Sequence, residues 1–317
     1  MPKRTSSCRP LSIGCILIFM AIAIHARQSD LSKLSGPYMG QKPPGNTPEI
    51  FAPGIVSTAE HEYGISFSQD LKKIYLKRIA SGTRNNLVFS CENDMWSGPE
   101  EVQFDVEGNF GLLFIMPEGK HLLANQITKA ADGEPQSTIV KFSRKNGRWG
   151  NPQAIGPGMR ATTTDSGHIY VTHVLDSKKS LGAIGRYKRA GDNYGTIEVL
   201  GDEINQKGIS NAHPFIAPDE SYLIFDSKKI GDDRGGLYIS FNLGGGSWSI
   251  AVNLSKILNT GKNANDWCAT VSPDGQYLFY SSGDRGQSDI YWVSAKIIEE
   301  LRSKLIANDE HLAKDIY

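Results

Sequence analysis

The stretch VSPDGQYLFYSS (residues 271–282) decides the fold. A β-branched start leads into a Ser-Pro-Asp-Gly turn, and an apolar, aromatic-rich strand follows the turn. A hairpin of this kind cannot bury both of its faces alone. The fold therefore depends on whether the same unit recurs along the chain.

The hairpin has five copies. They read ISFSQDLKKIYL (65–76), LFIMPEGKHLLA (113–124), ATTTDSGHIYVT (161–172), FIAPDESYLIFD (215–226) and TVSPDGQYLFYS (270–281). Successive copies are 48, 48, 53 and 55 residues apart, measured between the equivalent turn residues Leu71, Gly119, Gly167, Glu220 and Gly275. A period of this length is typical of repeat architectures built from one supersecondary unit.

An aromatic residue followed by a short outer strand recurs with a similar period. The four copies are MWSGPEEVQF (95–104), RWGNPQAIG (148–156), NYGTIEVLG (193–201) and SWSIAVNLS (247–255). Their rings are large enough to fill the wedge between neighbouring sheets. We expect this packing for Trp96, Trp149, Tyr194 and Trp248.

The two ends of the repeat region complement one another. The segment TPEIFAPGIVS (47–57) resembles GPEEVQF without its aromatic lead, whereas the last hairpin is followed only by SDIYWVSA (288–295). We therefore expect the first strand to complete the last sheet, which would remove exposed sheet edges. The sequence predicts an all-β β-propeller of four-stranded blades; five blades are favoured, and six remain an alternative if one copy has diverged.

Two copies carry a family resemblance. FIAPDESYLIFDS and TVSPDGQYLFYSSGDRGQSDIYWVS resemble the TolB-type (WD-type) β-propeller repeat of exported bacterial proteins, over roughly residues 48–297. The leader YMGQKPPGNTPEIFAPGIVS is similar to the segment before such repeats in a group of secreted proteins. The turn at 69–71 lacks the Pro and Gly of the pattern, and the turn at 164–167 is shifted by one residue. The resemblance implies protein–protein contact in the periplasm.

The flanking segments predict export and a docking helix. Residues 1–26 form a predicted signal peptide, with a basic start and the apolar core LSIGCILIFMAIAI (11–24). An uncleaved anchor and lipidation at Cys15 are the alternatives. Residues 27–47 are expected to be an irregular leader, 48–297 the propeller and 298–317 a C-terminal helix or tail. The helical pattern itself begins at residue 295. We expect a periplasmic or secreted protein without a transmembrane span after signal cleavage.

Composition excludes several classes of function. Lys plus Arg (34) equals Asp plus Glu (34), so no overall electrostatic field attracts nucleic acid. We expect the protein to be a monomer. After signal removal only Cys91 and Cys268 remain, and two buried free thiols are favoured over one disulfide. No GxSxG, HExxH, paired CxxC or phosphate-binding glycine loop occurs.

Five stretches precede the predicted innermost strands and should meet at one mouth of the channel: EHEYG (60–64), EGNFG (107–111), GPGMR (156–160), ISNAH (209–213) and NANDW (263–267). They supply eight candidate residues: His61, Glu62, Asn109, Arg160, Asn211, His213, Asn265 and Asp266.

Several roles are open to these side chains. His61, Glu62, His213 and Asp266 are suitable ligands for a divalent metal. Glu62 and Asp266 would alternatively form an acid/base pair acting on a glycoside. Arg160 suits an anionic group, and the asparagines suit a polar ligand. A purely structural role in capping strand ends is the remaining alternative.

Two functions follow from the predicted fold and from the candidate residues at the channel mouth. The first is an extracytoplasmic, non-catalytic module that binds or scaffolds a protein or a glycan. The second is a carbohydrate-active enzyme, a lyase or a glycosidase, that uses the channel mouth.

Overall fold

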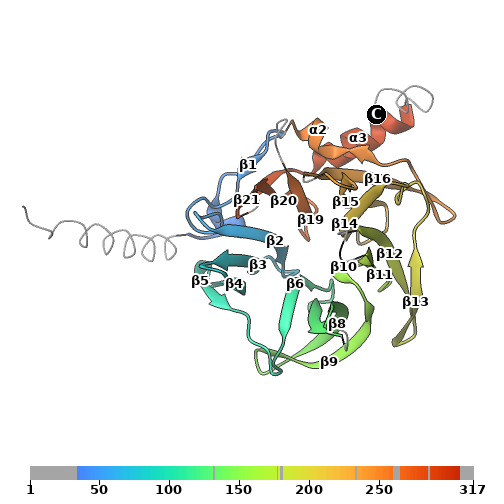
Figure 1. Cartoon of the computed structure of the whole chain (residues 1–317). Helices are drawn as coiled ribbons and strands as arrows, with labels where there is room; N and C mark the ends of the chain where they lie inside the picture. The colour runs from blue at the N-terminus through green and yellow to red at the C-terminus, as the bar shows by residue number, and fades with distance from the viewer. Residues whose placement is uncertain are drawn as a thin grey trace, which may run out of the picture.

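The computed structural model describes residues 34–130, 133–176, 178, 181–232, 234–259, 265–284 and 286–307. The predicted signal peptide and the last residues of the predicted tail lie outside these ranges. The described chain is mostly β-strand, and its sheets are arranged around a common centre (Figure 1).

Three groups of four consecutive strands form the first three antiparallel sheets. Sheet I contains β2 (His61–Phe67), β3 (Lys73–Ala80), β4 (Thr83–Glu92) and β5 (Met95–Glu101). Sheet II contains β6 (Asn109–Ile115), β7 (His121–Lys129), β8 (Pro135–Lys145) and β9 (Arg148–Pro157). Sheet III contains β10 (Met159–Thr163), β11 (Ile169–Asp176), β12 (Leu181–Ala190) and β13 (Asn193–Val199).

The last two sheets are less regular. Sheet IV contains β14 (Ile209–Ile216), β15 (Tyr222–Lys229) and β16 (Gly236–Gly244), with the short β17 (Ser247–Trp248) and β18 (Val252–Asn253) both paired to β16. Sheet V contains β19 (Asp266–Val271), β20 (Tyr277–Asp284) and β21 (Gln287–Ser294).

The N-terminal segment supplies the fourth strand of sheet V. Strand β1 (Glu49–Ile50) pairs antiparallel with β21, and Glu49 lies opposite Trp292. Sheets I and V are also bridged by a parallel pairing of His61 with Ser288, so hydrogen bonds link the beginning and end of the repeat region.

Five apolar clusters fill the wedges between neighbouring sheets, including the wedge between sheets I and V. The predicted wedge aromatics lie in four of them. Trp96, Trp149 and Trp248 are buried, whereas Tyr194 packs half-buried against the cluster between sheets II and III. The sequence prediction for these four rings is therefore confirmed.

The described part of the leader packs into the apolar cluster between sheets I and V, which an irregular linker does not need to do. The turn η1 (Pro37–Gly40) buries Tyr38 and Met39 in the cluster between sheets I and V. The Tyr38 hydroxyl donates to the Asp274 carboxylate in the last hairpin turn at 2.7 Å. The leader thus joins the same wedge as β1.

Two helices lie beside sheets IV and V. Helix α3 (Lys296–Ala307) buries Ile297, Ile298 and Leu301 against both sheets, so the predicted C-terminal helix is confirmed over its described length. Helix α2 (Leu254–Leu258), which the sequence did not predict, begins after Asn253, whose side chain accepts from the Lys256 amide. Within the described ranges no helix is long and apolar enough to cross a membrane. Cys91 and Cys268 are buried free thiols.

Every innermost strand contains a β-bulge near its middle. The register shifts fall between Tyr63 and Ser66, Phe110 and Leu113, Met159 and Ala161, Ala212 and Phe215, and Trp267 and Thr270. In sheet I the bulge uses Gly64 at φ 66°, where a Cβ would collide with the Leu112 side chain. A bulge turns a side chain out of the regular alternation of a strand.

A ring of polar residues surrounds the same centre, one from the second strand of each sheet. We call it the central ring; it consists of Lys77, Asn125, Thr172, Asp226 and Ser281. All but Asp226 are buried. Burying a polar side chain of this kind within an apolar strand is unfavourable unless the side chain forms hydrogen bonds.

Four members of the central ring bond to the backbone of the neighbouring sheet. Thr172 accepts from the His213 amide at 2.8 Å, Asp226 from the Cys268 amide at 3.2 Å, and Ser281 from the Gly64 amide at 3.2 Å. Lys77 donates to the Phe110 carbonyl at 2.6 Å, and burial lowers its pKa to about 8. Asn125 instead accepts from the Leu112 amide within its own sheet.

The wedge between sheets I and V gives a first prediction. Phe51 is fully buried beside β1 and packs edge-on against Phe279 and Trp292. We expect Phe51→Ala to lower the free energy of unfolding by about 3–5 kcal/mol, because it leaves a cavity in this wedge. Urea denaturation would measure the loss. The control Leu243→Ala removes a side chain that is 68% exposed and should change stability by less than about 0.5 kcal/mol; equal effects of the two substitutions would contradict the prediction.

Candidate functional site

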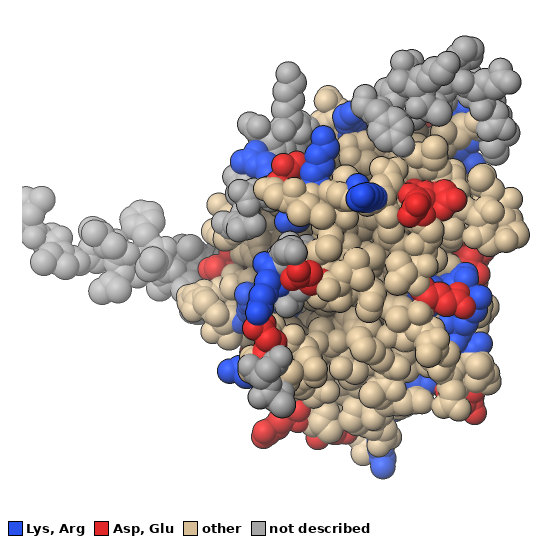
Figure 2. Space-filling model, turned by 45° about the vertical axis from the view of Figure 1, so that its right-hand side comes forward, with Lys and Arg blue, Asp and Glu red and all other residues tan. Residues whose placement is uncertain are grey.

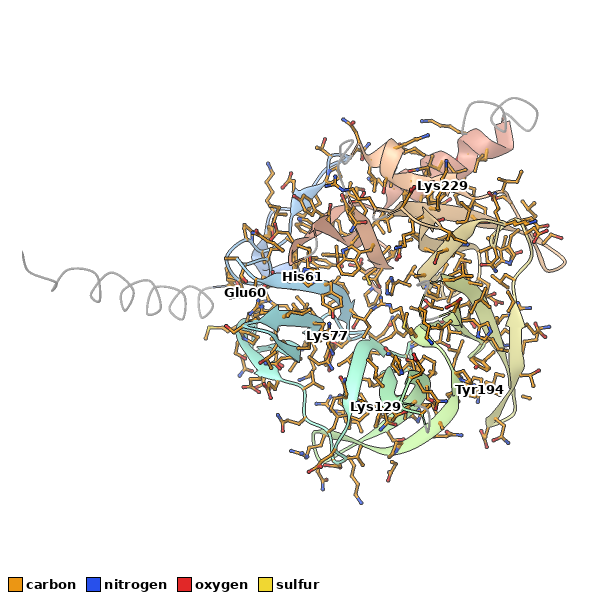
Figure 3. All side chains as sticks on the ribbon, in the orientation of Figure 1. Glu60, His61, Lys77, Lys129, Tyr194 and Lys229 are labelled. Carbon is orange, nitrogen blue, oxygen red and sulfur yellow. The ribbon has the colours of Figure 1, made fainter. Side chains whose placement is uncertain are left out.

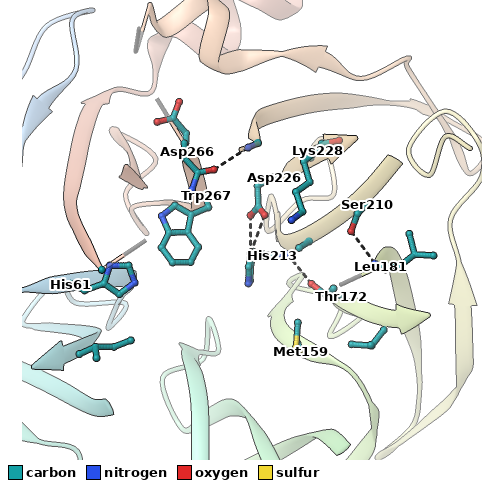
Figure 4. A pocket seen from close by; sticks show the side chains of 18 residues that line it. His61, Met159, Thr172, Leu181, Ser210, His213, Asp226, Lys228, Asp266 and Trp267 are labelled. Carbon is teal, nitrogen blue, oxygen red and sulfur yellow. Dashed lines mark hydrogen bonds and ion pairs between the residues drawn. The ribbon is translucent and has the colours of Figure 1, made fainter. Parts of the chain in front are cut away.

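A cavity of about 560 Å³ lies at the centre, on the side where the innermost strands begin. We call it the axial cavity (Figure 4). Its size lies in the range of small-ligand sites. Apolar walls from Ile79, Met159, Val174 and Leu181 face polar groups from sheets I, III, IV and V. The molecular face in Figure 2 carries charges of both signs in small scattered groups, so the cavity is the more distinctive feature.

Aromatic rings form one wall of the axial cavity. The Trp267 indole stacks on the Tyr63 ring, with ring centroids 5.1 Å apart and planes 11° from parallel. The His61 and His213 rings lie on either side of the indole, at centroid distances of 5.6 and 6.1 Å (Figure 4). Because Tyr63 holds the indole from behind, Trp267 presents a rigid flat surface to the cavity.

His213, beside the Trp267 indole, forms an ion pair with Asp226. The His213 Nδ1 atom lies 2.9 and 3.1 Å from the two Asp226 carboxylate oxygens, and the two side chains are 20% and 15% exposed. Burial disfavours a charged imidazole, but the Asp226 carboxylate outweighs it and holds the pKa of His213 well above its usual value. His213 is therefore a cation at neutral pH.

His61 differs from His213 in its surroundings. Its Nδ1 atom lies 3.0 Å from the Ser288 hydroxyl, which itself donates to the Glu62 carbonyl. Burial lowers the pKa of His61, and the Glu62 carboxylate opposes this shift without reversing it. The pKa values of the two histidines that line the cavity are therefore shifted in opposite directions. Figure 3 shows His61 and Lys77 on sheet I, on the side facing the centre.

Four of the eight candidate residues line the axial cavity: His61, His213, Asn265 and Asp266. Asp266 is almost fully buried and accepts from the Ser255 hydroxyl at 2.6 Å, and Asn265 accepts from the Gly235 amide. These two side chains connect the beginning of β19 to sheet IV and to α2.

Glu62 and the other asparagines are placed elsewhere. Glu62 accepts from Arg78 at 2.7 Å and from the Thr58 amide, and thereby fixes the connection between β1 and β2. Asn211 donates to the Ile204 carbonyl at 2.7 Å, and Asn109 is exposed at the start of β6. None of the three lines the axial cavity.

Arg160 is the most unusual of the candidates. It is the bulged residue of β10, it is completely buried, and none of its three guanidinium nitrogens has a hydrogen-bond partner. Its neighbour Met159 lines the axial cavity. Burial lowers the pKa of Arg160, while Asp226 and Cys268 lie near enough to oppose this shift electrostatically.

The candidate metal ligands do not meet. Glu62 is engaged by Arg78 and by the Thr58 amide in the connection between β1 and β2. Among the residues that the structure describes, no group of three or more His, Cys, Asp or Glu side chains is arranged to hold a metal ion.

Sequence reasoning did not select Asp226 or Trp267. A signal for Asp226 was present, because the second strands read IYLK (74–77), LLAN (122–125), IYVT (169–172), LIFD (223–226) and FYS (279–281), each ending in a polar residue. A polar residue at the same place in five otherwise apolar strands indicates a shared buried role.

Comparison with known proteins supports the fold. The chain matches a thermostable family-43 glycoside hydrolase at 13% identity and a TM-score of 0.50, over 74% of this chain and 89% of that one. It matches an endo-arabinase from Bacteroides thetaiotaomicron VPI-5482 at 14% identity and a TM-score of 0.49, over 79% and 95% of the two chains. TolB from Acinetobacter baumannii matches at 15% identity and a TM-score of 0.47, over 74% of this chain.

These likenesses extend to the fold only. The chain spans about half the length of TolB (54%). No family model matches the sequence, and no curated protein matches it. At these identities the chain has a propeller-type fold, and its function has to be argued from the axial cavity.

The His213–Asp226 pair makes stability depend on pH. The pKa of His213 is raised in the folded protein above the value of about 6.5 for an unfolded chain. The pair's contribution should thus be fully present below pH about 6.5 and lost as the pH rises through the raised value. We expect wild type to lose stability relative to His213→Gln over that alkaline range, measured by urea unfolding at several pH values. If the stability of the two proteins changed with pH in the same way, the raised pKa of His213 would be contradicted.

Proposed function

We propose that the protein is an exported, non-catalytic binding module, a five-bladed propeller closed by β1, whose axial cavity binds one unit of a glycan. The Trp267–Tyr63 stack carries this proposal. A sugar ring has an apolar face and a polar edge, and the flat indole beside polar walls matches both.

The size of the cavity favours a small unit over a folded protein partner. A stable protein–protein interface buries about 800 Å² on each partner and uses a broad surface. An inner hollow of about 560 Å³ suits instead one or two sugar rings at the end of a chain. The proposal that the protein is exported rests on residues 1–26, which resemble a signal peptide in sequence.

The five-bladed, closed arrangement is supported by contacts rather than by a continuous sheet. Five apolar clusters lie in five wedges, and β1 completes the last sheet. The Ser281–Gly64 hydrogen bond adds a polar contact between the last and first sheets.

A carbohydrate-active enzyme is the second candidate, and His213–Asp226 is the observation that favours it. A cationic imidazole held by a carboxylate can donate a proton to a leaving oxygen. The pair Glu62 and Asp266 has less support, because Glu62 already forms an ion pair with Arg78. Product formation from pooled oligosaccharides, followed by mass spectrometry, would distinguish this candidate from simple binding.

Binding to a pool of oligosaccharides tests the proposed function. We expect wild type to bind at least one oligosaccharide of the pool, as measured by calorimetry or on a glycan array. Trp267→Ala should weaken this affinity about tenfold or more, because the stacking surface is lost. The exposed Leu243→Ala is the control and should bind as wild type does. Binding that survives in a folded Trp267→Ala protein, or the absence of any glycan ligand, would refute the proposal.

A further inference from the structure

Part of the axial cavity is lined by aliphatic side chains that belong to no apolar core. We call them the aliphatic wall; they come from sheets I and III and are Ile79, Met159, Val174 and Leu181. Each is half-buried, and none belongs to the five apolar clusters that fill the wedges between sheets. Their apolar surface therefore faces the cavity.

The aliphatic wall is placed by the same alternation that places the central ring. Two residues after the ring member of its second strand, sheet I has Ile79, sheet III has Val174 and sheet IV has Lys228. Residues two apart in a strand face the same side, and all three side chains line the cavity. The lining thus changes from aliphatic to cationic between sheets III and IV.

An unsubstituted sugar does not suit the aliphatic wall. Its edge carries hydroxyl groups, and a hydroxyl placed against aliphatic side chains loses its hydrogen bonds to water without gaining others. A ligand group that is itself apolar would instead remove the surface of the wall from water, which is favourable. The wall therefore favours a sugar that carries an apolar substituent.

The order of the sheets determines what lies between Trp267 and the aliphatic wall. The inner strands of sheets III, IV and V pack side by side in that order, and Figure 4 shows His213 between Trp267 and Met159. Because Asp226 engages Nδ1, the His213 imidazolium has Nε2 as its second donor. Lys228 brings further donor hydrogens from the same sheet. A ligand that extends from the indole to the wall therefore meets donors first and aliphatic side chains last.

We propose that the axial cavity binds an N-acetylhexosamine unit, whose ring lies on Trp267 and whose acetamido group extends towards the aliphatic wall. This inference rests on the proposed function and narrows it to N-acetylated sugars. The amide carbonyl would accept from His213 or Lys228, and the methyl group on the same carbon atom would contact Met159 and Leu181. A 6-deoxy sugar also carries a methyl group, but it offers no carbonyl to the donors of sheet IV.

Matched probes separate this inference from the broader one. Titration calorimetry would compare trisaccharides ending in N-acetylglucosamine or N-acetylgalactosamine with the same trisaccharides ending in glucose, galactose or 6-deoxygalactose. We expect wild type to bind the acetylated probes about tenfold or more tightly. The plain sugars lack both the carbonyl acceptor and the methyl group, and 6-deoxygalactose lacks the carbonyl.

The variant Leu181→Asn tests the aliphatic wall itself. It replaces a wall side chain by a polar one of similar size, so we expect it to lower the affinity for the acetylated probes about fivefold or more and to narrow the ratio of acetylated to plain binding. The control Leu175→Asn makes the same change in the same sheet, at a side chain that is 53% exposed and does not line the cavity. It should keep the wild-type ratio.

The outcomes are distinct. Equal binding of acetylated and plain probes by wild type would overturn the inference and leave glycan binding intact, and so would equally tight binding of the 6-deoxygalactose probe. An unchanged ratio in a folded Leu181→Asn protein would also overturn it. If that variant does not fold, the ratio measured on wild type still decides the question. The absence of binding by any probe would refute both the inference and the proposed function.

Discussion

Hydrogen bonds that run from the second strand of one sheet to the bulged inner strand of the next determine the geometry of the whole centre. Thr172, Asp226 and Ser281 each accept from a backbone amide of the following sheet. These amides are shielded from water, so leaving one unpaired would cost about 1–3 kcal/mol. The sheets therefore cannot shift independently. The same bonds hold the bulged residues His213 and Cys268, so the fold and the candidate site depend on the same contacts.

The arrangement of the sheets was largely predictable, because it follows from a period. The hairpin and the wedge aromatics repeat along the chain, and each observation constrains the other. Helix α2 was not predictable in this way, since five residues are too few to show helical periodicity. The burial of Tyr38 was equally hidden, because it depends on Asp274, which lies 236 residues further along the chain.

The candidate site was predictable only in part, for reasons of side-chain direction. His61 and Glu62 are neighbours in a strand, so one faces the cavity and the other faces away. Arg160 left the expected alternation because it is bulged, and no local sequence pattern marks such a bulge. Asp226 comes from a second strand, whereas the predicted site residues all come from the stretches before the first strands. Its contact with His213 exists only once both strands are folded against each other.

A crystal structure of the protein with an oligosaccharide that it binds would test the central claim most directly. Our account predicts a sugar ring on the Trp267 indole. A sugar bound instead among the hairpin turns at the opposite end of the molecule, where Pro218, Pro273 and Arg302 line a second hollow, would contradict it. So would an axial cavity left without sugar at saturating ligand concentration.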